Sequence, residues 1–185
     1  MATTAEHARG RGIPTTSTVA PTAADRLRDD PLALESQVCF ALSAGARGLV
    51  ALYRPLLEPL GITHPQYLVL LALWQDDAAD RAGTVTDLAD RLALDAGTLS
   101  PLLRRLEAAD LLTRERSADD ARVVHVRLTG RGRALRAEAA KVPPAIAAAT
   151  GLTTEELAEI HTAASKVVAA ARRAGAIGST STGRR

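Results

Sequence analysis

The fold is decided by residues 84–132, which read TVTDLADRLALDAGTLSPLLRRLEAADLLTRERSADDARVVHVRLTGRG. The first part has the apolar period of a short amphipathic helix, with one face formed by Val85, Leu88, Ala89 and Leu92. Residues 95–97 break this pattern. A second amphipathic run follows, with one face formed by Leu99, Leu102, Leu103 and Leu106. We therefore expect two helices separated by a short turn.

The same stretch continues with two strand-like runs, residues 111–116 and 122–128, on either side of the polar turn 117–121. Helix, turn, helix and hairpin is the order of a winged helix-turn-helix. The predicted fold class is mainly α with a small β-hairpin. In such folds the second helix enters the DNA major groove and the hairpin lies against neighbouring backbone or minor groove. The expected partner is therefore double-stranded DNA.

The positions of the charged residues support a DNA partner more strongly than the net charge of the chain does. The formal net charge of +2 is too small to argue for nucleic acid on its own. The winged stretch, however, concentrates arginines: Arg104, Arg105, Arg114, Arg116, Arg122, Arg127, Arg131 and Arg133. Acidic residues are mixed among them, so any single arginine is equally consistent with a solvated, salt-bridged surface. As a cluster on this fold they favour DNA.

Other classes of protein are disfavoured by what the sequence lacks. One cysteine, Cys39, allows no internal disulfide framework and fits a reducing cytoplasm. No apolar run approaches membrane-spanning length, and the N-terminus lacks the pattern of a secretory signal. The four histidines are scattered, and no phosphate-binding loop or metal-spaced cluster occurs. We expect a cytoplasmic protein with no membrane partner, metal, cofactor or catalytic residue.

The rest of the chain is organised around the winged stretch. Residues 1–30 and 175–185 have the small, polar composition of disordered tails. The folded domain, residues 31–174, is predicted to have three parts: a helical arm at about 32–60, a DNA-binding core at about 64–130 and a second helical arm at about 131–174.

Proline and apolar patterns refine these boundaries. Pro55 is expected to kink or end a first helix that begins near Leu34. The helix at 66–74 is apolar nearly all round and is expected to be buried. A helix that begins near Arg131 is expected to stop at Pro143–Pro144, with a last helix running from a capping sequence at Thr153.

The two arms carry more apolar surface than a small winged domain covers. The stripe of the first arm is Leu34, Val38, Leu42, Leu49 and Leu52, and that of the last helix is Leu157, Ile160, Ala164, Val167, Val168 and Ala171. Pairing the arms of two chains buries both stripes and gives a two-fold homodimer. Such a dimer predicts an inverted-repeat operator. Packing of the arms within one chain as a bundle is the alternative.

Several segments together resemble the MarR family of bacterial repressors. The general motifs are GIT at 61–63 through LW at 73–74, LEAADLL at 106–112, DDAR at 119–122 and LT at 128–129. Four further segments resemble the organic-hydroperoxide-sensing branch, OhrR, of the one-cysteine type: LESQVCFAL at 34–42, LYRPLL at 52–57, PQYLV at 65–69 and DAGTLSPLL at 95–103. The resemblance covers nearly all of residues 31–174.

The resemblance implies that Cys39 is a redox-sensing thiol. Its place near a helix N-terminus favours the thiolate, which is the reactive form. In the family, tyrosine hydroxyls surround the sulfur, and Tyr53 matches one of them. Ser43 and His64 stand where the family has two more tyrosines, the second contributed by the partner subunit. A protonated His64 near the sulfur would favour the thiolate further.

The single cysteine limits the mechanism and leaves alternatives. An organic hydroperoxide would give a sulfenic acid, whose expected fates are a mixed disulfide with a low-molecular-weight thiol, a sulfenamide or overoxidation. Alternatively, Cys39 packs as a small apolar residue and a small apolar or phenolic ligand releases the repressor. A thiol peroxidase, which would need a resolving cysteine, and an architectural DNA binder are further alternatives.

The DNA-reading residues are expected on the second helix and the wing. The N-terminal half of that helix presents Thr98, Ser100, Pro101, Arg104 and Arg105. Arginine suits bidentate contact to guanine, whereas Thr98 is equally suited to a helix cap and Arg105 to a phosphate contact. On the wing, Arg122 is the expected minor-groove probe, with Asp120 placed to orient its guanidinium.

Overall fold

The computed structural model describes residues 30–178, which fall into two compact units, one up to Ala41 and one from Leu42 onward. The described helices are η1 (Leu34–Ser36), α2 (Val38–Leu57), η2 (Glu58–Leu60), α3 (His64–Ala78), α4 (Val85–Leu92), α5 (Ala96–Ala108), α6 (Gly130–Ala139), α7 (Val142–Thr150) and α8 (Thr154–Arg173). The described strands are β1 (Gly83–Thr84), β2 (Leu112–Arg116) and β3 (Val124–Leu128). The predicted fold class, mainly helical with a small sheet, is confirmed.

The first unit is a short lead-in to α2. Residues 34–36 form a 3₁₀ turn rather than the start of the expected long helix, and α2 begins only at Val38. The Gln37 side chain donates from Nε2 to the Pro31 carbonyl oxygen at 2.6 Å. That local bond holds the extended Gln37 backbone in place, and it accounts for the later helix start.

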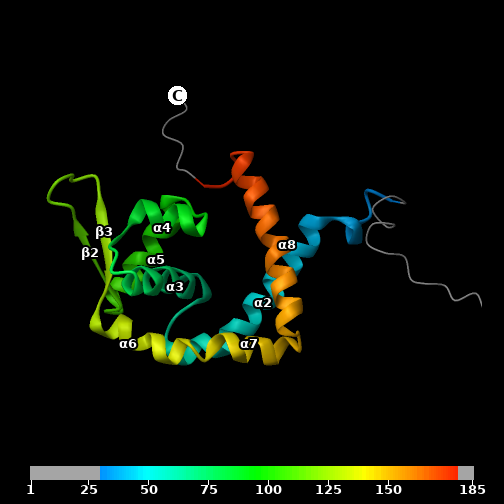
Figure 1. The fold of residues 1–185 in the computed structure, drawn as a ribbon, viewed down its shortest axis with the longest axis horizontal. Coiled ribbons are helices and arrows are strands. Elements are labelled where there is room, and N and C mark those ends of the chain that lie inside the picture. The colour runs from blue at the N-terminus through cyan, green and yellow to red at the C-terminus, as the bar shows by residue number, and fades with distance from the viewer. Residues whose placement is uncertain (1–29, 179–185) are drawn as a thin grey trace, which may run out of the picture. The chain divides into compact units, whose positions relative to one another are not determined.

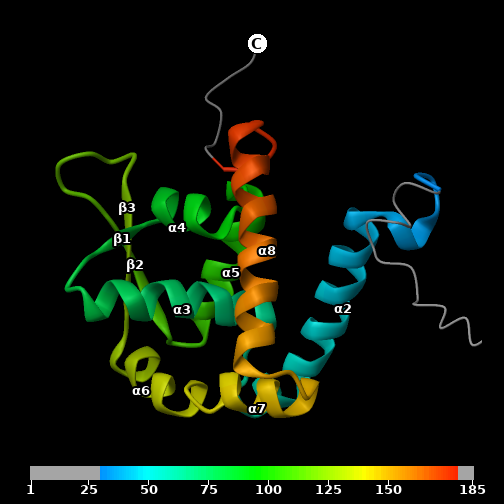
Figure 2. The same cartoon turned by 45° about the vertical axis from the view of Figure 1, so that its right-hand side comes forward.

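The sheet belongs to the second unit and has the strand order β1-β3-β2, with antiparallel pairing throughout. The predicted hairpin is confirmed, with Leu112 opposite Leu128 and Arg116 opposite Val124. The strand β1 was not predicted from the sequence, because two residues are too few to show an alternating pattern. In both views the loop joining β2 and β3 extends away from the helices (Figures 1 and 2).

The apolar core lies where α3, α4 and α5 meet the sheet (Figure 1). Its most completely buried large side chains include Leu70, Leu73, Leu88, Leu99, Leu103, Leu106, Leu112 and Val126. Most of the helix at 66–74 is buried in α3, as expected, and Leu68 and Leu71 are the residues of that stretch that stay exposed.

The break between the two helices of the motif lies earlier than expected. It comprises residues 93–95, not 95–97, and Gly97 belongs to α5. Asp95 ends the break because its carboxylate accepts a hydrogen bond from the Thr98 backbone N–H at 2.8 Å, which caps the new helix. Of the three residues 95–97 expected in the break, only Asp95 belongs to it, as the cap of α5.

The proline positions also differ from expectation. Pro143 and Pro144 do not stop a helix: α6 has already ended at Ala139, and the two prolines lie in the first turn of α7. A first-turn proline costs nothing, since its missing N–H has no intrahelical acceptor. Pro55 lies in the last turn of α2 and the helix continues to Leu57.

Gly132 is required where α6 packs against the core. A Cβ there would lie 2.0 Å from the Leu111 carbonyl oxygen, and the Gly132 carbonyl accepts a hydrogen bond from Trp74 Nε1 at 2.9 Å. Thr129 caps α6 and also donates from its hydroxyl to the Asp110 carbonyl at 2.7 Å. These contacts fix α6 to α3 and to the loop before β2.

The predicted disordered tails fall mainly outside the described residues. Residues 1–29 and 179–185 are not described, whereas residues 175–178 form a turn that follows α8, with Gly175 at φ 68°. Among residues 30–178, none of the helices has the length and apolar character needed to cross a bilayer.

Candidate nucleic-acid interface and thiol site

Helix α5 has one buried face and one polar face. Leucines anchor it to the core, and Thr98, Arg104 and Arg105 are exposed on the other side, whereas Ser100 and Pro101 are partly buried. The structure therefore presents two arginines and one threonine of the predicted reading set to solvent. The remaining two sit closer to the core than expected.

The N-terminus of α5 is organised by Asp95. Its carboxylate accepts hydrogen bonds from the Thr98 backbone N–H and from the Thr98 hydroxyl, each at 2.8 Å. These hydrogen bonds lower the pKa of Asp95. Thr98 is thus part of the helix cap, which was one of the two roles expected for it, and its hydroxyl proton is already used.

The arginines of the winged segment divide into two groups. Arg114, Arg122 and Arg133 form ion pairs with Glu107, Asp120 and Asp77. The others have no ion pair within residues 30–178 and are exposed: Arg104, Arg105, Arg116, Arg127 and Arg131. The unpaired group supplies cations that are free to meet phosphate.

The wing carries a bidentate ion pair at its turn. Arg122 donates from Nε to Asp120 Oδ1 at 3.0 Å and from Nη2 to Oδ2 at 2.9 Å, and its backbone N–H donates to Oδ1 at 2.9 Å. The guanidinium bonds lower the pKa of Asp120. The Arg122 side chain is nevertheless 90% exposed. The expected orientation of Arg122 by Asp120 is present, and the paired guanidinium remains exposed to solvent.

A second pair links the wing to α5 and was missed from sequence. Arg114 on β2 donates from Nε and Nη2 to Glu107 Oε2 at 2.9 and 2.6 Å, and the Arg114 backbone N–H reaches Oε1 at 3.2 Å. These bonds lower the pKa of Glu107. No short-range pattern relates a helix glutamate to a strand arginine, so only the fold reveals that the pair joins α5 to β2.

Asp76 is a buried carboxylate that joins three elements, and it was also missed. Only 3% of its side chain is exposed. Arg91 of α4 donates from Nη1 to both carboxylate oxygens at 2.8 Å, and Arg81, just before β1, forms a further ion pair. Gly83 passes so close that a Cβ would lie 2.8 Å from Asp76 Oδ2. The cluster fixes α3, α4 and the start of the sheet to one another.

Cys39 is the second residue of α2 and is exposed. It therefore lies in the first turn, at the positive end of the helix dipole. Ser43, also exposed, follows four residues later on the same helix. In the single chain Cys39 is therefore not packed in the core.

Tyr53 and His64 lie together in the second unit. Their ring centroids are 4.8 Å apart in an edge-on arrangement, and the Tyr67 ring lies 5.9 Å from that of Tyr53 in a tilted one. Burial raises the pKa of Tyr53, so its phenol stays protonated. Burial lowers the pKa of His64, so the imidazole is neutral at pH 7. The protonated His64 considered in the sequence analysis is thus disfavoured.

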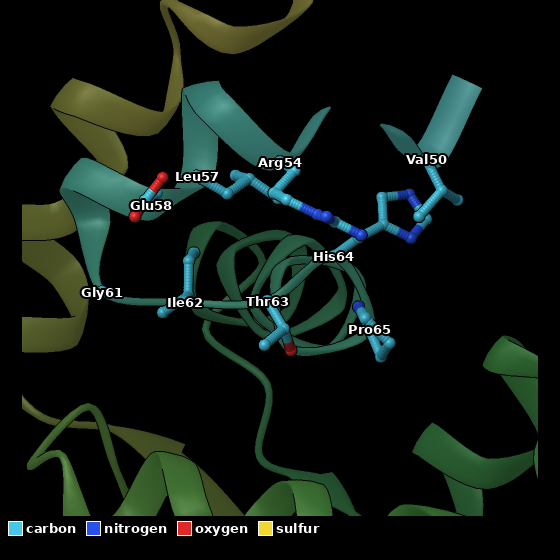
Figure 3. Close-up of a pocket in the computed structure, with 9 residues that line it drawn as sticks. All are labelled: Val50, Arg54, Leu57, Glu58, Gly61, Ile62, Thr63, His64 and Pro65. Carbon is cyan, nitrogen blue, oxygen red and sulfur yellow. The ribbon is translucent and has the colours of Figure 1, made fainter. Parts of the chain in front are cut away.

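A cavity of about 580 Å³ opens between the C-terminal half of α2 and the start of α3. Its lining is Val50, Arg54, Leu57, Glu58, Gly61, Ile62, Thr63, His64 and Pro65. Figure 3 shows the Arg54 side chain extending across it toward His64. Its volume is within the usual range for small-molecule sites.

The helical arms expose their apolar stripes. Helix α8 has no buried residue, and α2 has one, Leu57. The exposed apolar side chains on these helices include Val38, Leu42, Leu49, Leu52, Ile160, Val167 and Val168. The alternative of an intramolecular bundle would bury these side chains, and the described chain does not.

A helix-turn-helix followed by an arginine-bearing wing defines a winged-helix DNA-binding protein. Residues 51–138 match the family described as transcriptional regulator SarA/Rot. The organic hydroperoxide resistance transcriptional regulator of Bacillus subtilis is 40% identical over 134 residues, which cover 72% of this chain and 88% of that protein. The chain belongs to the MarR family of transcriptional regulators, whose members are regulators and not enzymes.

Two further similarities extend this result. The regulator TtmR of Methylorubrum extorquens is 43% identical over 129 residues, 70% of this chain, and the match spans only 64% of TtmR. AbfR of Staphylococcus epidermidis has been solved bound to DNA in reduced and overoxidised forms, at 29% and 28% identity and a TM-score of 0.61 for each, covering 76% of this chain and 96% of AbfR. The resemblance inferred from the sequence motifs is confirmed.

Proposed function

We propose that this chain is a homodimeric repressor that releases an inverted-repeat operator when an organic hydroperoxide oxidises Cys39. The observation that carries the proposal is the exposed thiol in the first turn of α2. It stands in a chain 40% identical to a regulator named for organic hydroperoxide resistance. The functional domain is residues 31–174, with its helical arms at 32–60 and 131–174.

The chemistry needs one thiol, a peroxide and a second thiol. The Cys39 thiolate attacks the peroxide, the O–O bond breaks, and sulfenic acid and an alcohol form while sulfur loses two electrons. A low-molecular-weight thiol of the cytoplasm then displaces water and leaves a mixed disulfide. The thiol lies in the first turn of α2, at the positive end of the helix dipole.

We assign three side chains to support this thiolate in the dimer: Tyr53, Ser43 and His64. A protonated phenol is a hydrogen-bond donor, and the raised pKa of Tyr53 keeps it so. The lowered pKa of His64 means that it acts as a neutral donor rather than as a cation. Ser43 supplies a shorter hydroxyl. The adduct on sulfur displaces these groups and shifts the arms.

The dimer reads DNA with two copies of α5 and two wings. We assign major-groove contacts to Thr98, Ser100, Pro101, Arg104 and Arg105, and a minor-groove contact to Arg122, held by Asp120. Dimerisation through the apolar stripes of α2 and α8 sets the distance between the two α5 helices. A shift of a few ångströms in that distance, caused by the adduct, prevents both from entering their half-sites.

Parallel mass spectrometry and operator binding test the scheme. Reduced protein is treated with cumene hydroperoxide and a small thiol, and one adduct per subunit on Cys39 should accompany loss of operator binding. Cys39→Ser is the matched variant and should stay bound. Release of DNA without an adduct would contradict the scheme. Release of Cys39→Ser by a phenolic compound would assign sensing to the cavity beside Arg54 instead.

A further inference from the structure

The C-terminal end of α8 contacts the helix-turn-helix directly. Arg172, in the last turn of α8, donates from Nη2 to the Asp90 carbonyl oxygen at 2.6 Å and lies 3.5 Å from the Arg91 carbonyl oxygen. Both carbonyls belong to the last turn of α4. In both views the red end of α8 lies toward α4 (Figures 1 and 2). A long helix of the second arm thus touches the element that precedes the DNA-reading helix.

The contact satisfies a need of α4. The last carbonyls of a helix have no intrahelical donor and form the negative end of its dipole, where a guanidinium is favourable. The Asp90 carbonyl also accepts a longer 3.3 Å bond from the Ala93 N–H. Arg172 therefore supplies the shorter of the two bonds at the point where α4 ends.

The turn that follows is strained. Ala93 has φ 53°, a left-handed conformation that its Cβ makes unfavourable. Two residues later Asp95 caps α5. The direction in which α5 leaves this turn depends on the conformation of Ala93, and the Arg172 bond holds the backbone three residues before it.

Arg172 is itself held in place. Gly175 adopts the left-handed conformation at φ 68°, and the Gly175 and Ala176 N–H groups donate to the Arg172 and Ala171 carbonyls at 3.0 and 2.9 Å. This ending turns the chain back so that Gly178 lies against the Arg172 side chain. The turn at the end of α8 thereby fixes the position of the Arg172 guanidinium.

We infer that Arg172 is a positioning residue for DNA binding, which fixes the end of α4 and so the direction of α5. The inference rests on the proposed function, because it concerns binding of the operator. This inference goes beyond the proposed function in one respect. It joins α8, which we place at the dimer interface, to the helix-turn-helix through the Arg172 contact.

The test compares Arg172→Ala and Arg172→Lys with Arg173→Ala, whose neighbouring guanidinium has no hydrogen-bond or ion-pair partner within residues 30–178. Reduced full-length variants are titrated on the operator at several salt concentrations. Arg172→Ala should bind about 3- to 10-fold more weakly with an unchanged salt slope, since the guanidinium meets a carbonyl and not a phosphate. Arg172→Lys should restore part of the affinity, and Arg173→Ala should equal the wild type.

Hydrogen exchange gives a readout that is independent of DNA. Amides of residues 90–98 should exchange faster in Arg172→Ala than in Arg173→Ala. Equal affinity and equal exchange in the two variants would overturn the inference. A reduced salt slope in Arg172→Ala would overturn it too, because Arg172 would then contact phosphate. Failure of the proposed function shows separately, as wild-type protein that ignores hydroperoxide.

Discussion

The winged core and the two helical arms are built in opposite ways. In the core, α3, α4 and α5 enclose fully buried leucines, and ion pairs centred on Asp76 and Glu107 join neighbouring elements. In the arms, α8 buries no side chain and α2 buries one. The core has its packing partners within the chain, whereas the arms leave apolar surface exposed in the single chain, which the proposed dimer would cover.

The difference assigns separate tasks to the two regions. A core fixed by buried contacts presents its arginines in one geometry, which suits reading of DNA. Arms whose packing depends on a partner can change arrangement without unfolding the core. A chemical modification of α2 can therefore change the distance between the two winged cores of the proposed dimer, while each core stays unchanged. The predictions below separate the two regions.

The largest effect on operator binding is expected from a charged residue within the apolar stripe of α8. Ile160 is 54% exposed in the single chain. Ile160→Glu should block dimerisation, because the carboxylate would be buried among apolar side chains. Loss of one half-site contact should then weaken operator binding by about 100-fold or more. Sedimentation and fluorescence anisotropy measure both quantities. Lys166→Glu, on the opposite face of α8, is the control, and a dimeric Ile160→Glu would refute the assigned interface.

In the core, removal of the Asp76 charge should cost stability without changing the dimer. Asp76→Asn leaves Arg91 and Arg81 without their carboxylate, and we expect a loss of about 2 kcal/mol in the free energy of unfolding. Denaturant titration measures it. Asp77→Asn removes an exposed pair with Arg133 and should cost less than about 0.5 kcal/mol. Equal losses would mean that the buried cluster does not hold the core together.

At the wing, variants of the Arg122–Asp120 ion pair distinguish the contact of Arg122 with DNA from the orientation of its side chain by Asp120. Arg122→Ala should weaken operator binding about 10-fold and reduce the salt slope, because a cation that meets DNA is lost. Asp120→Asn keeps the cation and should cost about 3-fold with the slope unchanged. Asp119→Asn on the same turn should have no effect. If Arg122→Ala binds like the wild type, the wing does not contact DNA.

The smallest effect concerns pH. Burial lowers the pKa of His64 below its unfolded value near 6.5, so the folded state binds fewer protons. The stability contribution is complete above about pH 6.5 and is lost as pH falls below it. Thermal midpoints at pH 8 and pH 5.5 should therefore differ more for the wild type than for His64→Asn. His161→Gln, which changes an exposed histidine, is the control, and an unaltered pH dependence in His64→Asn would exclude this role.

The sequence predicted those features that rest on local patterns. Apolar periods identified both helices of the motif, the hairpin and the exposed stripes of the arms, because each is repeated over several residues. The break between α4 and α5 was misplaced, since the carboxylate of Asp95 and not Gly97 begins the second helix. The prolines after α6 were misread, because proline starts a helix as readily as it stops one.

Long-range contacts were beyond the sequence. Asp76 and Arg91, Glu107 and Arg114, and Arg172 with the Asp90 carbonyl come together only in the fold. No spacing rule joins them, and each replaces water with a specific partner. The lowered pKa of His64 was also not visible from the sequence, because it follows from burial beside Tyr53 and not from a position at a helix start.

The central claim is that oxidation of Cys39 alone controls operator release. Fluorescence anisotropy of an operator duplex, followed through addition of an organic hydroperoxide and then of excess dithiol, tests it most directly. The account predicts that wild-type protein dissociates at about one oxidation per subunit and rebinds on reduction, while Cys39→Ser stays bound throughout. Dissociation of Cys39→Ser at the same peroxide dose, or retention of DNA by protein fully oxidised at Cys39, would contradict it.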